Sequence, residues 1–368
     1  MKPYNGIILV TGASGSIGSV VMRRMAGRFE GIVGFDREAP KLPSPGCLYV
    51  PVDVTSDESV REGLRIVREH HGTQVASLIH LAAYYDFLGE PTTKYDEITV
   101  GGTRRLLRGL LDGGFQVAQF VFSSTMLVHG PVEPGQFITE DSALAPTWAY
   151  PESKVQTEAL IRTERGDMPV ALLRIAGVYD DGCHSIPLAH QIQRIYERQL
   201  NSHFYSGETA HGQAFLHMDD LVDAIERVVD RRAELPPELP LLVGEAEVLS
   251  YDEIQHTLAR LIHGESSETY EVPRPIAKVG AWVEDQLPGK AFIKPWMIDR
   301  ASDHYALDIT RARTLLGWEP KRSLRETLPK MVEALKADPA RWYKENKLEL
   351  PSSLEEYSAK SEEEVRVG

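Results

Sequence analysis

Tyr150 and Lys154 are the residues of this chain whose types and spacing most directly suggest chemistry. They lie four positions apart in the stretch YPESK, which places both side chains on one face of a helix, about one turn apart. A phenol has an ordinary pKa of about 10 and is a poor base at neutral pH, whereas a neighbouring ammonium favours phenolate and lowers that pKa. The pair could therefore act as a general base or acid at a reacting hydroxyl. The alternative is an exposed tyrosine and a solvated lysine on a surface helix.

Thr125 is a third candidate, because it directly follows the run FVFSS at 120–124, which has the apolar character of a buried strand. Ligands in parallel α/β sheets bind at the carboxyl ends of the strands. The Thr125 hydroxyl could therefore hydrogen-bond the reacting oxygen and share its proton with Tyr150. The alternative is a turn residue with no chemical role.

A glycine-rich stretch near the N-terminus forms a second constellation, since residues 6–18 read GIILVTGASGSIG. The run at 7–11 has no polar alternation, which is typical of a strand buried on both faces of a parallel sheet. Gly12, Gly15 and Gly18 follow, and residues 20–28 have a helical pattern. Glycines allow a tight turn and a close backbone approach, and the free N–H groups of a helix start attract an anion. Strand, turn and helix together predict a seat for the pyrophosphate of a dinucleotide.

Asp36 and Arg37 indicate which dinucleotide would bind. Asp36 ends a strand-like run at 31–36, 18 residues after Gly18, near the offset at which a carboxylate accepts the ribose hydroxyls of NAD. A carboxylate there repels the 2′-phosphate of NADP, so Asp36 favours NAD. Arg37 could instead receive that phosphate, which leaves NADP as the alternative. A bound, oxidised nicotinamide would add positive charge that also favours the phenolate of Tyr150.

The elements that must position these residues alternate along the first 180 positions. Strands are expected at 6–11, 31–36, 47–54, 75–83, 116–124 and 169–178, and helices at 20–28, 57–70, 95–111 and 146–165. Ser56 or Asp57 would cap the second helix. Strands alternating with helices imply right-handed crossovers and a parallel sheet. The predicted fold class is α/β, a Rossmann-type doubly wound parallel sheet with a smaller C-terminal α/β substrate-binding region.

The alternation loosens from about residue 182. Helices are expected at 188–199, 219–232, 250–262, 278–286, 308–317 and 324–337, a strand at 241–244, and further short strands between 182 and 217. Ser250 and Glu253 form a capping pair for the helix at 250–262. We therefore divide the chain into an NAD-binding domain at 1–181, which includes the Tyr-Lys helix, and a mainly substrate-binding region at 182–337. Some segments of that region would return to the Rossmann core, and a charged C-terminal tail at 338–368 would form a peripheral arm.

Composition and charge limit the function classes. The net charge is −14 and no basic stripe stands out, so nucleic acid and anionic membranes are poor candidate partners. No apolar run approaches the ~18 residues that span a bilayer, and no signal peptide is expected before the first strand. The only cysteines, Cys47 and Cys183, have no metal-ligand or CxxC spacing. The expectation is a cytoplasmic enzyme with free thiols, a small-molecule substrate and no metal.

Six stretches, in this order, resemble the extended short-chain dehydrogenase/reductases, the NAD-dependent epimerase/dehydratase family. They are TGASGSIG at 11–18, HLAA at 80–83, FSST at 122–125, YPESK at 150–154, FLHMDDLVDA at 215–224 and LGWEP at 316–320. The resemblance covers roughly residues 6–330 and implies hydride transfer between nicotinamide and the carbon of a secondary alcohol or ketone.

The resemblance also implies site residues. Thr125, Tyr150 and Lys154 would form a catalytic triad, in which Tyr150 is the general base or acid and Lys154 binds the nicotinamide ribose and tunes the phenol. Besides Tyr150 and Lys154, the implied cofactor contacts are Gly12, Gly15, Ser16, Ile17, Gly18, Asp36, Arg37, Asp53, Val54, Leu81, Ala82 and Ala83.

Departures from the family pattern narrow the chemistry. Sugar 4,6-dehydratases of the family carry an Asp-Glu pair directly after the catalytic hydroxyl residue, whereas Met126 and Leu127 follow Thr125 here, so dehydration is not expected. Nucleotide-sugar epimerases usually carry an asparagine and an arginine where this chain has Gly177 and Gln213, which weakens the case for a nucleotide diphosphate. Other polar residues could contact substrate or could be structural; they are Tyr84, Tyr85, His129, His184 and His217.

Three functions remain open at this point. The first is an NAD-linked oxidoreductase acting on a secondary carbinol or its ketone, and the second is a sugar epimerase that keeps its NAD tightly bound. The third is a non-catalytic dinucleotide sensor, against which the intact Thr125, Tyr150 and Lys154 set argues.

A homodimer is also expected, because the helices at 95–111 and 146–165 pair in relatives to make a four-helix interface. Their apolar residues could form that interface or face their own sheet; they are Leu106, Leu107, Leu110, Leu111, Val155, Leu160 and Ile161.

Overall fold

A parallel sheet organises the computed structural model, which describes residues 4–40, 42–86, 92–266, 268–273, 275–277 and 295–351. The strands run in the order β11-β7-β6-β4-β1-β2-β3, and the short β5 pairs with β4. Their bounds are β1 Tyr4–Thr11, β2 Phe29–Asp36, β3 Leu48–Pro51, β4 Gln74–His80, β5 Gln116–Val117, β6 Phe120–Thr125, β7 Val170–Ile175 and β11 Glu238–Val243. The order reverses direction between β1 and β4, which is where a doubly wound sheet opens a crevice for ligands. The predicted fold class is confirmed.

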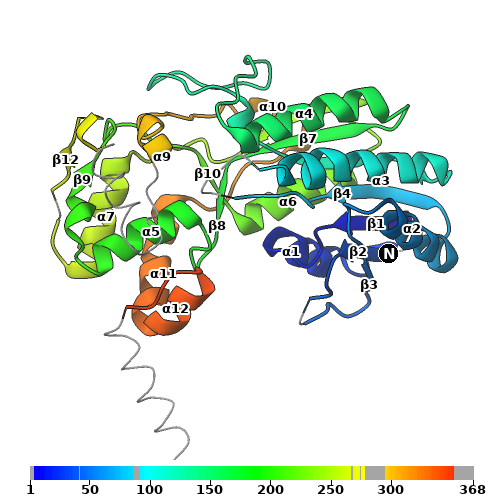
Figure 1. Ribbon diagram of the computed structural model, residues 1–368, viewed down its shortest axis with the longest axis horizontal. Helices are drawn as coiled ribbons and strands as arrows, with labels where there is room; N and C mark the ends of the chain where they lie inside the picture. The colour runs from blue at the N-terminus through cyan, green and yellow to red at the C-terminus, as the bar shows by residue number, and fades with distance from the viewer. Residues whose placement is uncertain are drawn as a thin grey trace, which may run out of the picture.

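Helices cover both faces of this sheet (Figure 1). Apolar side chains of α1 (Ser16–Met25) and α6 (Met218–Asp230) are part of the core cluster on one face. A second cluster takes its side chains from three other helices, which are α2 Asp57–His71, α3 Gly101–Asp112 and α4 Ala149–Glu164. None of the described helices is long and apolar enough to cross a membrane.

A second lobe with its own apolar cluster stands beside one end of the sheet (Figure 1). Its elements are β8 Gly177–Tyr179, α5 Ile186–Tyr196, β9 Phe204–Tyr205, β10 Phe215–His217, α7 Tyr251–His263, β12 Tyr270–Glu271, α9 Pro295–Asp299, α11 Leu324–Ala337 and α12 Pro339–Glu345. Between these elements the chain returns to the sheet, where β11 pairs in parallel with β7 and α10 (Thr310–Leu316) contacts β11.

Several element bounds differ from the sequence prediction. The first helix begins at Ser16, inside the glycine turn, and the strand expected at 116–124 is two strands, β5 and β6. The helix expected from 95 opens with a π-helical segment, η1 (Tyr95–Val100), before α3. The predicted caps at Ser56 and Ser250 are confirmed. The helix expected at 278–286 lies outside the described residues.

The charged segment after residue 338 is not simply a peripheral arm. It begins with α12, whose Trp342 and Tyr343 side chains are buried in the second lobe. The many charges of the segment favour an exposed arm in the sequence. Two large aromatic side chains nevertheless supply enough apolar area to hold a short helix in place.

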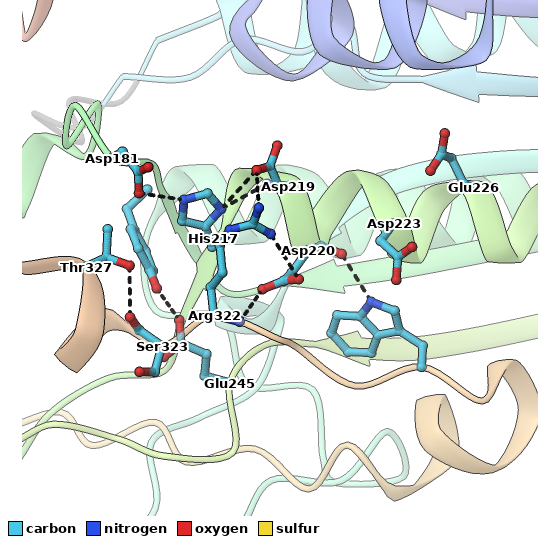
Figure 2. Close-up of polar contacts among 12 residues, drawn as sticks. Asp181, His217, Asp219, Asp220, Asp223, Glu226, Glu245, Arg322, Ser323 and Thr327 are labelled. Atoms are coloured by element: carbon cyan, nitrogen blue, oxygen red, sulfur yellow. Dashed lines mark hydrogen bonds and ion pairs between the residues drawn. The ribbon is translucent and has the colours of Figure 1, made fainter. Parts of the chain in front are cut away.

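A polar cluster ties the segment before α11 to the end of the sheet (Figure 2). The Trp318 indole N–H donates to the carbonyl of Asp220 at 3.1 Å, and the backbone N–H of Arg322 donates to the Asp220 carboxylate at 2.9 Å. Glu245, which follows β11, accepts from the Tyr179 hydroxyl at 2.8 Å and from the backbone N–H of Leu324 at 2.9 Å. The segment is therefore fixed at both α6 and β11.

Glu245 makes stability depend on pH. Burial raises the pKa of its carboxyl from 4.5 to about 7, so the folded chain holds this proton over a range in which the unfolded chain has lost it. The resulting stability is present at low pH and is lost as the pH rises through about 7, by up to about 3 kcal/mol. Denaturant unfolding at about pH 5 and pH 8 is expected to show a smaller pH difference in Glu245→Gln than in the wild type. Glu247→Gln, at an exposed carboxylate paired with Arg325, should leave the pH difference as it is; an unchanged profile in Glu245→Gln contradicts the assignment.

Candidate active site

The glycine turn between β1 and α1 forms a close-fitting backbone cradle. Gly12 has φ +70° and its N–H donates to the Phe35 carbonyl at 2.9 Å, which fixes the turn against β2. A Cβ at Gly18 would lie 2.1 Å from the Gly12 carbonyl oxygen, so no side chain fits there. Ser16 and Ile17 begin α1, and its N-cap residue Gly15 supplies no side-chain cap. The first N–H groups of α1 are thus open to an anion, as a pyrophosphate requires.

Asp36 lies at the end of β2 beside this cradle. Its carboxylate accepts the backbone N–H of Ser14 at 2.9 Å and that of Arg37 at 2.8 Å, so its position is set by the turn itself. Asp53, after β3, accepts two hydrogen bonds from Thr55, and these lower the pKa of its carboxyl. These two acids stand at the carboxyl ends of neighbouring strands, as the sequence predicts.

Changing the charge of Asp36 should alter the choice of dinucleotide. In Asp36→Asn the shape is kept but the repulsion of a 2′-phosphate is removed, so the ratio of NAD⁺ to NADP⁺ affinity is expected to shift about tenfold toward NADP⁺. Calorimetric titration with both dinucleotides measures this ratio. Glu38→Gln, at an exposed acid of the same loop, is the matched control and should leave the ratio unchanged.

The segment that follows β4 lies directly opposite the glycine turn. The N–H of Leu81 donates to the Thr11 carbonyl at 3.2 Å, and that of Ala82 donates to the Thr11 hydroxyl at 3.2 Å. A Cβ at Gly12 would come within 2.9 Å of the Ala82 nitrogen, so the two backbones are in contact. Ala83 continues this segment. Val54 lies against Gly102 of α3.

His80 joins three of these elements, a role that the sequence analysis missed. It is fully buried, with Nδ1 2.6 Å from the Thr11 hydroxyl and Nε2 2.9 Å from the Thr103 hydroxyl of α3. Burial, assisted by the charge of Lys154, lowers the pKa of His80 to about 3, so the ring is neutral at working pH. In the sequence, this role is indicated only by the position of His80 in the family-like stretch HLAA at 80–83.

Tyr150, Lys154 and Thr125 come together where β6 ends and α4 begins. Lys154 is 2% exposed, and its Nζ donates to the Ser123 carbonyl of β6 at 2.7 Å. That Nζ lies 5.7 Å from the centre of the Tyr150 ring. Thr125 is the last residue of β6, and its hydroxyl is close enough to the Tyr150 phenol to lower the pKa of that phenol. The alternative of an exposed surface pair is wrong, because α4 buries Lys154 against the sheet.

Burial dominates the electrostatics of the pair. It lowers the pKa of Lys154 to about 7, an effect that the negative charge of Glu158 opposes. Burial raises the pKa of Tyr150 to about 12, while the Thr125 hydroxyl acts in the other direction. Burial therefore keeps the phenol protonated in the chain without cofactor, and the expectation that Lys154 and an oxidised nicotinamide together lower its pKa stays a prediction.

Aromatic rings enclose the Tyr150 phenol. Tyr85, from the segment after β4, meets it edge-on with ring centres 4.8 Å apart, and the Trp148 ring lies 5.5 Å away. Tyr84 packs instead against Tyr95 of η1 at 4.9 Å. Because Tyr85 belongs to the same segment after β4 as Leu81 and Ala82, its contact brings Tyr150 to the same end of the sheet as the glycine turn.

A cavity of about 340 Å³ opens beside this site. Trp148 and Leu127 line its near wall, and the second lobe supplies the rest, including Arg194, Arg300 and Gln213. The guanidinium of Arg300 donates to the Thr147 carbonyl at 3.0 Å, which ties the second lobe to the start of α4.

Aromatic side chains make up part of the far wall of this cavity. Tyr205 and Tyr251 stack there with ring centres 3.7 Å apart. Only Gln213 and Leu127 of the lining residues could be singled out in the sequence, because the others come from segments far apart in the chain and form no motif.

The three candidate histidines are held by contacts within the protein. His129 is fully buried between the Ala143 carbonyl and the Arg174 guanidinium, and His217 caps α6. His184 pairs with Asp180 at 2.8 Å. None of the three lines the cavity of about 340 Å³. Among the described residues, no group of three or more His, Cys, Asp or Glu could hold a metal ion.

Known proteins resemble this chain over most of its length. The chain is 24% identical over 334 residues to UDP-glucose 4-epimerase of Vibrio cholerae, which covers 89% of this chain and 94% of the relative. It is 25% identical over 345 residues to dTDP-6-deoxy-L-talose 4-dehydrogenase (NAD(P)(+)) of Kitasatospora kifunensis, covering 90% and 96%. A 3-beta-hydroxysteroid dehydrogenase of Mycolicibacterium neoaurum matches over 211 residues at 24% identity, covering 54% of this chain and 53% of the relative.

Solved structures share the fold. UDP-glucose 4-epimerase of Thermotoga maritima, with UDP-glucose, superposes with a TM-score of 0.67 at 22% identity, covering 90% of this chain and 99% of that one. MoeE5 in complex with UDP-glucose and NAD superposes with a TM-score of 0.66 at 23% identity, covering 91% and 100%. The model of the NAD dependent epimerase/dehydratase family matches residues 8–244. The chain therefore belongs to this family, and it is an NAD-dependent enzyme of the extended short-chain dehydrogenase/reductase type.

Proposed function

We propose that Thr125, Tyr150 and Lys154 carry out NAD-linked oxidation of a secondary alcohol, or reduction of the corresponding ketone. The observation that carries the proposal is the position of Lys154, whose buried ammonium is bonded to the strand that ends at Thr125 and lies one helical turn from Tyr150. All three residues stand at or next to the carboxyl end of β6, and β4 lies between β6 and the strand that leads into the glycine turn.

The three residues have distinct roles in this proposal. Tyr150 removes the hydroxyl proton during oxidation and returns it during reduction, and Thr125 holds the reacting oxygen by a hydrogen bond. Lys154 supplies positive charge that favours the phenolate. NAD, when bound, would supply the hydride acceptor and a positive charge that favours the phenolate of Tyr150, which burial alone keeps protonated. Gly12, Gly15, Gly18 and Asp36 would hold it.

The substrate would be a small carbinol, such as a sugar, placed in the cavity next to Trp148. The runner-up is a nucleotide-sugar epimerase with tightly bound NAD, which the likeness to UDP-glucose 4-epimerases favours. Arg194 and Arg300 could meet a phosphate there, although Gln213 replaces the arginine usual in such enzymes.

Two measurements on the purified protein separate these activities. The first is the nucleotide released on denaturation, identified by mass. The second is the change in reduced nicotinamide when NAD⁺ is mixed with UDP-glucose, UDP-glucuronic acid or a 3β-hydroxysteroid as probes. Steady net reduction of added NAD⁺ supports the dehydrogenase. Tightly bound NAD with conversion of a UDP-sugar and no net redox change supports the epimerase. Failure to bind NAD⁺ at all would refute both.

We also propose that the protein is a homodimer and works in a reducing compartment, the cytoplasm. The apolar residues that could have formed the interface mostly face their own sheet, since Leu106, Leu107, Leu110, Leu160 and Ile161 lie in the core of this chain. Leu111, 44% exposed on α3, and the half-buried Val155 on α4 remain for an interface. Both cysteines are free thiols, which fits a reducing compartment. Light scattering measures the oligomeric state.

A further inference from the structure

Glu158 continues the line of functional side chains along α4. Tyr150, Lys154 and Glu158 follow each other at intervals of four residues, so they occupy one face of the helix. The Glu158 side chain is 0% exposed, and a buried carboxylate is costly unless it is paired and hydrogen-bonded. Neither the family motifs quoted above nor the proposed reaction explains why a carboxylate is buried at this position.

The contacts of Glu158 lead to the catalytic strand. One carboxylate oxygen accepts the Ser124 hydroxyl at 2.6 Å, and Ser124 stands between Ser123, which binds Lys154, and Thr125. The Arg174 guanidinium of β7 donates to both carboxylate oxygens, at 2.8 and 3.2 Å. One carboxylate therefore holds α4, β6 and β7 together directly beneath the proposed site.

Arg174 is itself anchored, which keeps this pair rigid. Its remaining terminal nitrogen donates to the Glu140 carbonyl at 2.8 Å and lies 3.1 Å from Nε2 of His129. With 3% of its side chain exposed, Arg174 has little freedom to move away from Glu158. Arg162, one turn further along α4, contacts the outer side of the Glu158 carboxylate at 3.3 Å.

We propose that Glu158 is a positioning residue that sets the distance between β6 and α4 and favours the charged form of Lys154. This inference rests on the proposed role of Lys154 as the ammonium that assists Tyr150. Other groups facing Lys154 do not supply negative charge: His80 of β4 is neutral, Tyr150 is a phenol, and Ser123 offers a carbonyl. Burial lowers the pKa of Lys154. Among the described charged side chains around it, only Glu158 raises that pKa.

The experiment reads the protonation of Lys154 directly and needs no substrate. Lysine side chains are labelled with ¹³C and ¹⁵N, the Lys154 signal is identified by its loss in Lys154→Arg, and the signal is followed from about pH 5 to pH 10 by NMR. In Glu158→Gln the ratio of ammonium to amine at a given pH is expected to fall about tenfold. Glu158→Asp keeps the charge and should restore most of the ratio.

Two further variants keep the test decisive. Ser124→Ala removes the hydroxyl bond but not the charge, so it should leave the ratio near the wild-type value. Glu158→Gln leaves Arg174 buried without its counter-charge and could unfold the chain. In that case Glu158→Gln combined with Arg174→Gln is compared with Arg174→Gln alone, so that the two proteins differ only in the carboxylate. Near-ultraviolet circular dichroism verifies that each variant is folded.

The result that overturns the inference is a Lys154 ratio unchanged in a folded variant without the carboxylate, which would make the Glu158–Arg174 pair a purely structural one. This outcome is separate from failure of the proposed function. If Tyr150→Phe kept full activity while the Lys154 ratio moved, the triad would be refuted and the effect of Glu158 on Lys154 would stand.

Discussion

Replacement of Tyr150 by phenylalanine is expected to lower kcat/KM by about a hundred- to ten-thousandfold, the usual contribution of a positioned general acid or base. The loss follows from the position of the phenol beside Thr125. Lys154 is bonded to Ser123 and the His80 ring is neutral, so among these described residues Tyr150 is the expected proton donor and acceptor. The rate is measured as reduction of NAD⁺ with the probe that the wild-type protein converts fastest.

Affinity for NAD⁺ should change little in this variant, because the glycine turn and Asp36 are untouched. Tyr49→Phe is the matched control, since Tyr49 is a phenol of the same domain on β3, and it should keep the wild-type rate. Full activity in Tyr150→Phe would leave the chain as a dinucleotide-binding protein whose chemistry lies elsewhere.

Gly18→Ala should have the second large effect, on cofactor binding and on stability together. The new Cβ would lie 2.1 Å from the Gly12 oxygen and 2.8 Å from the Ala13 Cα, both backbone atoms of the turn that cannot rotate aside. The turn and α1 must move apart to admit the methyl group, which should lower the free energy of unfolding by about 3 kcal/mol. The same movement should weaken NAD⁺ binding by about a hundredfold or more. Denaturant titration and calorimetry measure the two effects.

Gly130→Ala is the matched control for this substitution. A Cβ at Gly130 would lie 3.4 Å from the nearest atom, the Cβ of Ala145, which is ordinary contact. This variant should bind NAD⁺ normally and unfold within about 1 kcal/mol of the wild type. Equal behaviour of the Gly18 and Gly130 variants would show that the glycine turn is not a cofactor cradle.

The Rossmann sheet, the family and the NAD cofactor could be predicted from the sequence because each depends on local pattern. The run before Gly12 is apolar without alternation, and Gly18 and Asp36 stand at fixed offsets from it. The roles of Thr125, Tyr150 and Lys154 remain predictions, although the structure places all three together.

Features that depend on contacts between distant segments could not be predicted in this way. The strands β9 and β12 are two residues each and pair across more than 60 positions, so neither leaves a periodic signal. The pKa of Tyr150 is set by burial among Tyr85 and Trp148, which spacing along one helix does not reveal. Helix α12 was concealed by the charges around Trp342 and Tyr343.

The pairing of β11 with β7 has a consequence for how the polypeptide matures on the ribosome. When residues 1–181 have emerged, β7 has β6 on one side and bare backbone N–H and C=O groups on the other. That flank stays open to other chains until Glu238–Val243 has been synthesised, more than 60 residues later. The nascent half is therefore most prone to aggregate during that interval. A truncated chain that ends at the apparent lobe boundary would leave this edge of β7 exposed permanently.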